Sequence, residues 1–259
     1  MGVANKAYKF RIYPTKDQEQ LIRKTFGCVR FVYNKMLAER KETYEQFKDD
    51  KYHISILTEY EHKPIPKEIK AIVGLDFAMD SLYVESEQGE KANHPRFFRQ
   101  TQKKLAKEQK VLSRRTKGSA RYEKQRIKVA ALHERVANQR RDFLHKKSCQ
   151  LASRYDCVVI EDLNMKGMSQ SLHFGKSVAD NGWGMFTTFL HYKLLEQGKH
   201  LVKINKWFPS TKTCSNCGHV KNVALSERLY SCECGFVRDR DWNAAINIKN
   251  EGKLMLALP

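Results

Sequence analysis

Two pairs of cysteines in the C-terminal part of the chain could bind a metal ion. Two residues separate Cys214 from Cys217, one residue separates Cys232 from Cys234, and a glycine follows each pair. Four thiolates presented by two tight turns are a common ligand set for a tetrahedral zinc ion, and four protein ligands leave no position open for a substrate. The spacing therefore predicts a structural zinc ion, with two disulfides or four unrelated thiols as the alternatives. His219 lies beside the first pair, but four cysteines already complete such a site.

Acidic residues at the boundaries of predicted elements could bind metal ions of a second kind. Asp76 ends a continuously apolar strand, Glu161 ends another, and Asp239 and Asp241 precede a short helix predicted at residues 242–250. Each of them alone could equally be a turn residue. Carboxylates from separate elements can hold two Mg²⁺ ions about 4 Å apart, which activate a water and stabilise the leaving oxygen of a phosphodiester. Together the acids predict a site for phosphodiester hydrolysis.

The elements that must position these acids form an α/β pattern. The acid-bearing strands are predicted at residues 72–76 and 157–161. A strand at 82–86 can pair with the first of them, and a hairpin that begins with an acid is typical of a ribonuclease H-like domain. An amphipathic helix is predicted at 183–197, with Gly198 at its end, and a further strand at 200–204. The Gly-, Ser- and Lys-rich residues from 163 to 180 predict a loop.

The N-terminal segment has an α+β pattern of its own. An alternating strand is predicted at residues 8–13 and stops at Pro14. Thr15 and Gln18 have the spacing of a capping box at the start of a helix. A second helix reaches about residue 47, and another strand follows at 52–58.

The residues from 95 to 155 are helical in pattern and strongly basic. They contain 19 Lys and Arg against four acidic residues, and Gly118 divides them into two helices. A solvated helix usually mixes charges of both signs, so this excess predicts contact with nucleic acid. The whole chain of 259 residues carries a formal charge of +19.

Other features of the composition indicate a cytoplasmic protein. No apolar run approaches the roughly 18 residues that cross a membrane, and the N-terminus lacks a signal-peptide pattern. The remaining cysteines, Cys28, Cys149 and Cys157, lie in apolar-patterned segments and are expected to be buried.

Four motifs together resemble the TnpB (OrfB) family of insertion-sequence-encoded, RNA-guided nucleases, which are related to the type V CRISPR effectors. They are Gly74-Leu75-Asp76, Ile160-Glu161-Asp162-Leu163-Asn164, residues 212–218 and residues 239–248. The resemblance implies a RuvC-type nuclease with the catalytic acids Asp76, Glu161 and Asp241, catalytic Mg²⁺, and a zinc ribbon. It also implies a guide RNA and cleavage of target DNA beside a short recognised motif. The family places its last acid two residues before the Asn of an Asn-Ala-Ala motif, which here selects Asp241 over Asp239.

One departure from the family concerns the N-terminal part. Only residues 41–51 occupy the position of the family's helical recognition domain and much of its wedge domain. The predicted fold is thus α/β: a ribonuclease H-like (RuvC) domain with a basic helical insertion, a zinc ribbon, and a small N-terminal α+β remnant of a wedge domain. The expected boundaries are 1–62 for the remnant, 63–210 for the nuclease core, 211–237 for the zinc ribbon, and 238–259 for the last motif and C-terminal helix.

The sequence therefore predicts an RNA-guided DNA endonuclease in internally shortened form that hydrolyses phosphodiesters by a two-metal mechanism. The main alternative is a non-cleaving RNA- or DNA-binding remnant or regulator. A transposase that joins DNA ends is a third hypothesis.

Overall fold

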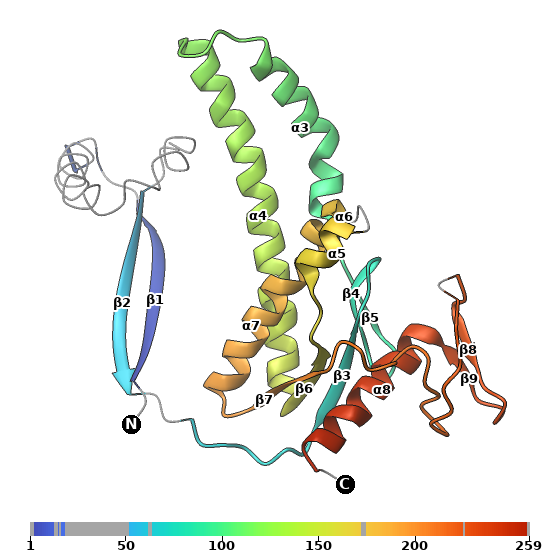
Figure 1. Cartoon of the computed structure of the whole chain (residues 1–259). Coiled ribbons are helices and arrows are strands. Elements are labelled where there is room, and N and C mark those ends of the chain that lie inside the picture. Colours follow the sequence, from blue (N-terminus) through green and yellow to red (C-terminus); the bar gives the residue numbers. More distant parts are fainter. Residues whose placement is uncertain are drawn as a thin grey trace. The chain divides into compact units, whose positions relative to one another are not determined.

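The computed structural model describes residues 3–12, 15, 17, 18, 52–61, 64–171, 175–224 and 226–257 (Figure 1). The chain divides into two units. One consists of Met1–Lys63 with Thr101–Val136, and the other of Pro64–Gln100 with Ala137–Pro259. The part of the chain that the structure describes contains no helix with the length and apolar character needed to cross a membrane.

The first unit contains a two-stranded hairpin. Strands β1 (Val3–Ile12) and β2 (Tyr52–Glu61) pair antiparallel along their whole length, so both strands predicted here are confirmed and are longer than expected. The capping box is also confirmed: the backbone N–H of Thr15 donates to Gln18 Oε1 at 3.0 Å, and that of Gln18 donates to Thr15 Oγ1 at 3.4 Å. Most of the two helices predicted up to residue 47 lies outside the described residues.

The same unit includes most of the first basic helix and the N-terminal part of the second, within residues 101–136. These helices are α3 (Phe97–Ser113) and α4 (Ala120–Arg154), and they are divided near Gly118 as predicted. The side-chain amide of Gln125 joins them, since its Nε2 donates to the carbonyl of Glu108 at 3.0 Å and to Glu108 Oε2 at 2.7 Å.

The second unit is built on a five-stranded mixed sheet in the order β5-β4-β3-β6-β7. The central strand β3 pairs antiparallel with β4 and parallel with β6, and β6 in turn pairs parallel with β7. The strands are β3 (Ile72–Phe77), β4 (Ser81–Glu85), β5 (Lys91–Asn93), β6 (Cys157–Glu161) and β7 (His200–Ile204). The predicted α/β organisation of this part is confirmed.

Alternate residues of β3 and β6 face opposite sides of the sheet, as the two-residue period of a strand requires. Leu75 and Ile160 pack in one core with residues of α4 and of α7 (Trp183–Glu196). On the other side Val159 packs with Ile248 of α8 (Arg240–Met255). Asp76 follows Leu75 directly, and Glu161 is two residues after Val159. The side chains of both acids therefore lie on the face that α8 covers.

Two glycines let α8 approach the sheet closely. A Cβ atom on Gly74 of β3 would lie 2.6 Å from the backbone nitrogen of Lys249. A Cβ on Gly252 of α8 would lie 2.6 Å from Cγ1 of Val159. Because real Cβ atoms do not approach other atoms so closely, both positions need glycine for this packing. The close packing fixes the first turn of α8, and with it Asp241.

The prediction of a loop between residues 163 and 180 is wrong. The structure has two short helices there, α5 (Met165–Ser171) and α6 (Gly175–Asn181). Asn164 caps α5 by accepting from the backbone N–H of Gly167 at 2.9 Å. Asp180 is buried and accepts from the N–H of Phe98 at 3.0 Å, in the first turn of α3. Long-range contacts of this kind give no periodic signal in a short polar sequence.

Two smaller predictions, the bounds of the C-terminal helix and the burial of Cys149, also differ from the structure. Helix α8 begins at Arg240 and continues to Met255, beyond the predicted residues 242–250. Cys149 is exposed on α4 and not buried, whereas Cys157 is buried as predicted. Cys28 lies outside the described residues.

Candidate active site and metal centre

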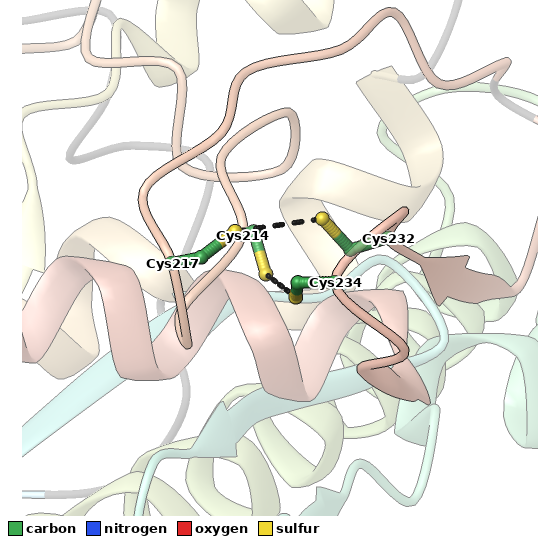
Figure 2. Close-up of side chains that lie close together, drawn as sticks. All are labelled: Cys214, Cys217, Cys232 and Cys234. Carbon is green, nitrogen blue, oxygen red and sulfur yellow. Dashed lines mark hydrogen bonds between the residues drawn. The ribbon is translucent and has the colours of Figure 1, made fainter.

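The four predicted cysteine ligands meet in one cluster (Figure 2). The sulfurs of Cys214 and Cys234 are 3.8 Å apart, and those of Cys217 and Cys232 are 3.6 Å apart. A tetrahedral ion with metal–sulfur bonds of about 2.3 Å places its sulfurs about 3.8 Å from one another. All four of these cysteines are free, which excludes the disulfide alternative. The cluster therefore has the ligand type and spacing of a four-cysteine metal site, and His219 is not part of it.

The thiols of this cluster differ strongly in acidity. The backbone N–H of Phe236 and the amide of Asn216 lower the pKa of Cys234 to about 6. The backbone N–H of His219 favours the thiolate of Cys217, but the sulfurs around it raise its pKa to about 12. Several thiolates at this distance repel one another, so full ionisation needs a cation between them. A divalent metal ion supplies that charge.

The three predicted acids also form a cluster, at the end of β3 and β6 that faces the start of α8. Asp76 is 8% exposed, and burial raises its pKa well above the ordinary value. The carboxylates of Glu161 and Asp241 raise it further, Arg240 opposes the shift, and Asp239 makes the smallest contribution to raising it. The carboxylates near Asp76 thus outweigh Arg240 in their effect on its pKa, and a bound divalent cation would relieve that repulsion.

The acids are spaced more widely than the cysteines. Among the described residues, the four cysteines are the only group of three or more His, Cys, Asp or Glu whose ligand atoms lie within 4.8 Å of one another. Ligands of a single ion must be that close. No group of three acids in the described part of the chain meets this spacing.

Glu161 is oriented by a residue that the sequence did not suggest. Burial raises the pKa of Glu161, and the hydroxyl of Ser210 opposes this by donating to Glu161 Oε1 at 2.6 Å. Ser210 itself is buried. A serine in a connecting segment has no distinctive pattern, so nothing in the sequence indicated this contact.

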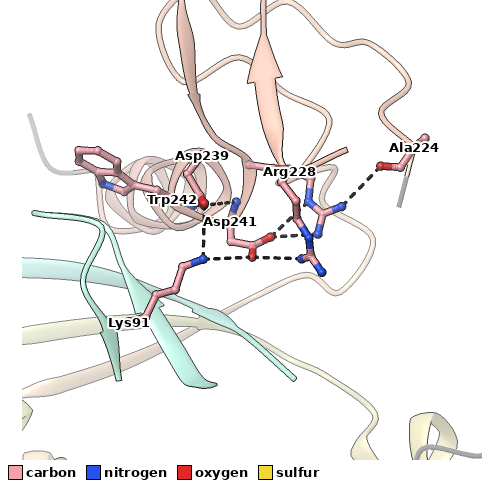
Figure 3. A network of polar contacts seen from close by, with 7 residues as sticks. Lys91, Ala224, Arg228, Asp239, Asp241 and Trp242 are labelled. Carbon is pink, nitrogen blue, oxygen red and sulfur yellow. Dashed lines mark hydrogen bonds and ion pairs between the residues drawn. The ribbon is translucent and has the colours of Figure 1, made fainter. Parts of the chain in front are cut away.

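Asp239 and Asp241 have different surroundings, although only one residue separates them. Asp239 caps α8: its Oδ1 accepts from the backbone N–H of Asp241 at 3.0 Å and of Trp242 at 3.1 Å. Asp241 Oδ1 instead accepts from Arg240 Nη2 at 3.0 Å. Asp241 Oδ2 lies 4.0 Å from Lys91 Nζ and 4.0 Å from Arg228 Nη1 (Figure 3). Capping of α8 thus accounts for Asp239, the first aspartate of the motif.

Two buried asparagines connect α8 to the cysteine cluster. Asn243 Nδ2 donates to the carbonyl of Thr213 at 2.7 Å, and its Oδ1 accepts from the N–H of Ser215 at 3.0 Å. Asn247 Nδ2 donates to the carbonyls of Ser210 and Thr213, both at 2.7 Å. The first cysteine of the cluster lies between Thr213 and Ser215. The four-residue spacing of the two asparagines places them on one face of a helix, but nothing in the sequence indicates their partners.

Three family models match successive parts of the chain. A helix-turn-helix domain of OrfB proteins of the IS605 type matches residues 1–49. An OrfB model of the same type, described as "Probable transposase", matches residues 55–172. The TNB domain of Cas12f1-like proteins matches residues 183–248.

Several curated proteins are similar to most of the chain. A protein of Streptomyces pristinaespiralis named "Putative RNA-guided DNA endonuclease" is 35% identical over 254 residues, which cover 96% of this chain and 63% of the relative. Escherichia coli InsQ, which carries the same description, is 34% identical over 224 residues, covering 80% and 55%. The chain thus spans between about half and two thirds of the length of these relatives.

Solved structures show a related fold. A chain in the cryo-EM structure of a Cas12f1–sgRNA–target DNA complex matches 79% of this chain and 44% of its own length, with a TM-score of 0.55. A CRISPR–Cas12f ternary complex gives a TM-score of 0.51 over 77% of this chain and 42% of its own. The sequence identities are 19% and 21%, so this likeness concerns the fold alone.

Proposed function

Because the chain belongs to the TnpB (OrfB) family, we propose that it is an RNA-guided, metal-dependent DNA endonuclease in internally shortened form. Its active site consists of Asp76, Glu161 and Asp241. The observation that carries this proposal is the raised pKa of the buried Asp76, which results from burial and from the nearby carboxylates of Glu161, Asp241 and, last, Asp239. A fold tolerates such a concentration of like charge where a function uses it.

The donor set suits Mg²⁺, which prefers carboxylate oxygens and keeps some of its water ligands. When bound, two such ions supply Lewis-acid stabilisation of the phosphodiester and a water molecule of lowered pKa. Asp76, Glu161 and Asp241 would hold them. The four cysteines would hold a structural zinc ion.

The other residues of the site orient these acids and attract the substrate. Ser210 fixes the rotamer of Glu161 through its 2.6 Å hydrogen bond. Lys91, Arg228 and Arg240 surround Asp241 and provide positive charge for a phosphate of the DNA backbone. The basic residues of α3 and α4 bind the guide RNA and the target DNA through their phosphates.

Cleavage by the 259-residue chain tests this proposal. The protein is purified, the RNA that co-purifies with it is sequenced, and a plasmid library matched to that RNA is incubated with Mg²⁺. We expect linear plasmid, and a loss of about 100-fold or more in rate for Asp76→Asn and Glu161→Gln. Equal cleavage by these variants and the parent would show that the site is assigned wrongly.

The pair Asp241→Asn and Asp239→Asn tests the choice between the two aspartates. Asparagine caps a helix about as well as aspartate, so Asp239→Asn keeps the start of α8 intact. We expect it to cleave at a rate close to that of the parent, whereas Asp241→Asn loses activity. The reverse result would assign the catalytic role to Asp239.

A second candidate function is a nucleic-acid-binding regulator that does not cleave. The short segment at residues 41–51, in place of the family's helical recognition domain, favours it. Tight, salt-sensitive RNA binding without Mg²⁺-dependent products would support this function. A transposase, as the description of one matching family suggests, would give joined DNA strands in the same assay.

A further inference from the structure

Trp207 presents its indole ring to solvent. Its side chain is 80% exposed, while Trp183 is 3% exposed in the core. Trp242, the third tryptophan, donates its indole N–H to the carbonyl of Ser86 at 2.9 Å and is covered by Arg238, 4.1 Å from its ring centroid. Trp207 is therefore the one tryptophan of the chain whose ring is available to a partner.

The backbone around Trp207 is held in place. The N–H of Trp207 donates to Asn205 Oδ1 at 2.9 Å, and the N–H of Phe208 donates to the carbonyl of Asn205 at 3.0 Å. Ile204 on one side is fully buried, and Phe208 on the other packs against the same core beneath α8. An exposed ring on an anchored turn loses little conformational entropy when a flat ligand stacks on it.

This turn lies at the edge of the proposed active site. Trp207 is three residues before Ser210, whose hydroxyl binds Glu161. Three residues of chain span at most about 10 Å, so the Cα atoms of Trp207 and Ser210 are no farther apart than that.

The charge around Trp207 is positive. Lys206 Nζ lies 5.1 Å from the centroid of the indole ring. Lys203 and Lys212 lie on the same segment, and no acidic residue occurs between them. Lys203 is paired with Asp162 at 3.2 Å, which leaves Lys206 and Lys212 as the charges nearest to Trp207 along the chain. An aromatic ring beside cations is the combination that binds single-stranded nucleic acid, through base stacking and phosphate contacts.

We propose that Trp207 stacks on an unpaired base of single-stranded DNA next to the phosphodiester at the acidic cluster, and that Lys206 contacts an adjacent phosphate. A duplex cannot supply this base, because its bases are already stacked on one another. The inference rests on the proposed function and names a residue that positions its substrate. It makes Trp207 a substrate-positioning residue.

Tryptophan fluorescence tests this proposal without cleavage. The full-length Asp76→Asn protein is titrated with a 12-nucleotide oligo(dT), with the same sequence in a duplex, and with oligo(U). Stacking quenches the emission of the exposed indole, so we expect oligo(dT) to quench it and the duplex to quench it much less. Combining Trp207→Ala with Asp76→Asn should remove the quench. It should also weaken oligo(dT) binding about 5- to 150-fold, as expected for one stacked base. Trp207→Phe should retain most of the affinity.

Leu195→Ala is the matched control, because Leu195 is also an exposed apolar side chain (52%) but lies on α7. We expect it to bind oligo(dT) as the parent does. Equal quenching or equal affinity in the Trp207→Ala protein would overturn the proposal, as would tighter binding of oligo(U) than of oligo(dT). If Trp207-dependent binding of DNA is found but the parent never cleaves, the stacking role stands and the nuclease proposal fails.

Discussion

The hydroxyl of Ser210 donates a hydrogen bond of 2.6 Å to Glu161 Oε1, joining two residues that are 49 positions apart in the chain. The carbonyl of Ser210 accepts from Asn247 of α8 at 2.7 Å. Ser210 thus connects the end of β6, the helix that carries Asp241 and the segment that leads into the cysteine cluster. The geometry of the acidic site consequently depends on a residue that holds no metal.

The first prediction follows from this contact. Ser210→Ala removes the hydrogen bond that orients Glu161 and that opposes the rise of its pKa. Loss of such an outer partner typically lowers metal affinity or activity about 10- to 100-fold, so we expect cleavage to need more Mg²⁺. A Mg²⁺ titration of the cleavage rate measures this. Ser153→Ala is the control, since the hydroxyl of Ser153 donates to a carbonyl of its own helix. An unchanged Mg²⁺ requirement in Ser210→Ala would contradict the role assigned to Ser210.

The second prediction concerns the stability of the protein without Mg²⁺. The pKa of Asp76 is higher in the folded protein than in the unfolded chain, so its protonation favours folding. The stability that this group contributes is complete below the unfolded pKa, about 3.9, and is lost as the pH rises through the folded pKa. Asp76→Asn keeps the shape and removes the charge. We therefore expect a higher Tm than the parent at pH 7–8, and a difference that shrinks as the pH falls toward about 4.

Thermal unfolding in Mg²⁺-free buffer across this pH range tests that expectation. Addition of Mg²⁺ should raise the Tm of the parent and leave that of Asp76→Asn nearly unchanged. Asp80→Asn, at an exposed aspartate four residues further along, should match the parent throughout. If Asp76→Asn is less stable than the parent at pH 8, the repulsion between the three acids is not what the structure indicates.

The sequence was informative where a strand or a ligand set has a local signature. β3 and β6 are short apolar runs with an acid at or next to the last position, and the cysteine spacing requires two turns, so both features could be predicted. The contacts of Ser210, Asn243 and Asn247 could not, because each joins segments that only the folded chain brings together. Helices α5 and α6 were missed for the same reason: they are short and polar, and their stability comes from remote partners such as the start of α3.

The third prediction tests the packing of α8 on β3. Gly74→Ala places a methyl group against the backbone of Ala245 and Lys249, neither of which can move without the helix. Overpacking of this kind typically destabilises by about 1–3 kcal/mol. It should also displace Asp241 from Asp76 and lower cleavage. Urea unfolding and the plasmid assay measure the two effects.

Gly184→Ala is the control for that experiment. Gly184 lies in α7 and a Cβ atom there would have no neighbour within 4 Å. Alanine is favoured over glycine in a helix by about 1 kcal/mol, so this variant should be as stable as the parent or slightly more stable. Wild-type stability and activity in Gly74→Ala would mean that α8 does not need its close approach to the sheet.

The fourth prediction concerns the metal at the four cysteines. Cys232→Ser should lower the zinc content and, through Asn243 and Asn247, loosen the segment that holds Ser210. Structural zinc contributes about 10–16 kcal/mol in small zinc peptides, so removal should unfold residues 211–237. Metal analysis and hydrogen exchange of these residues provide the measurement. Cys149→Ser, at an exposed cysteine on α4, is the matched control; unchanged exchange after verified metal removal would show that the ion is not structural.

The fifth prediction tests whether the basic helices bind nucleic acid. Arg114, Arg115 and Lys117 lie exposed where α3 leads into α4. Each phosphate contact contributes about 0.7–0.9 to the slope of log K against log salt, so replacing all three by Gln should reduce the slope by up to about 2–3. The rate of cleavage at saturating substrate should not change, because none of the three lies near the acids in sequence. Lys146→Gln is the control, since Lys146 is paired with Asp142 at 2.7 Å and contributes less net charge. An unchanged salt slope in the triple variant would place nucleic-acid binding elsewhere on the protein.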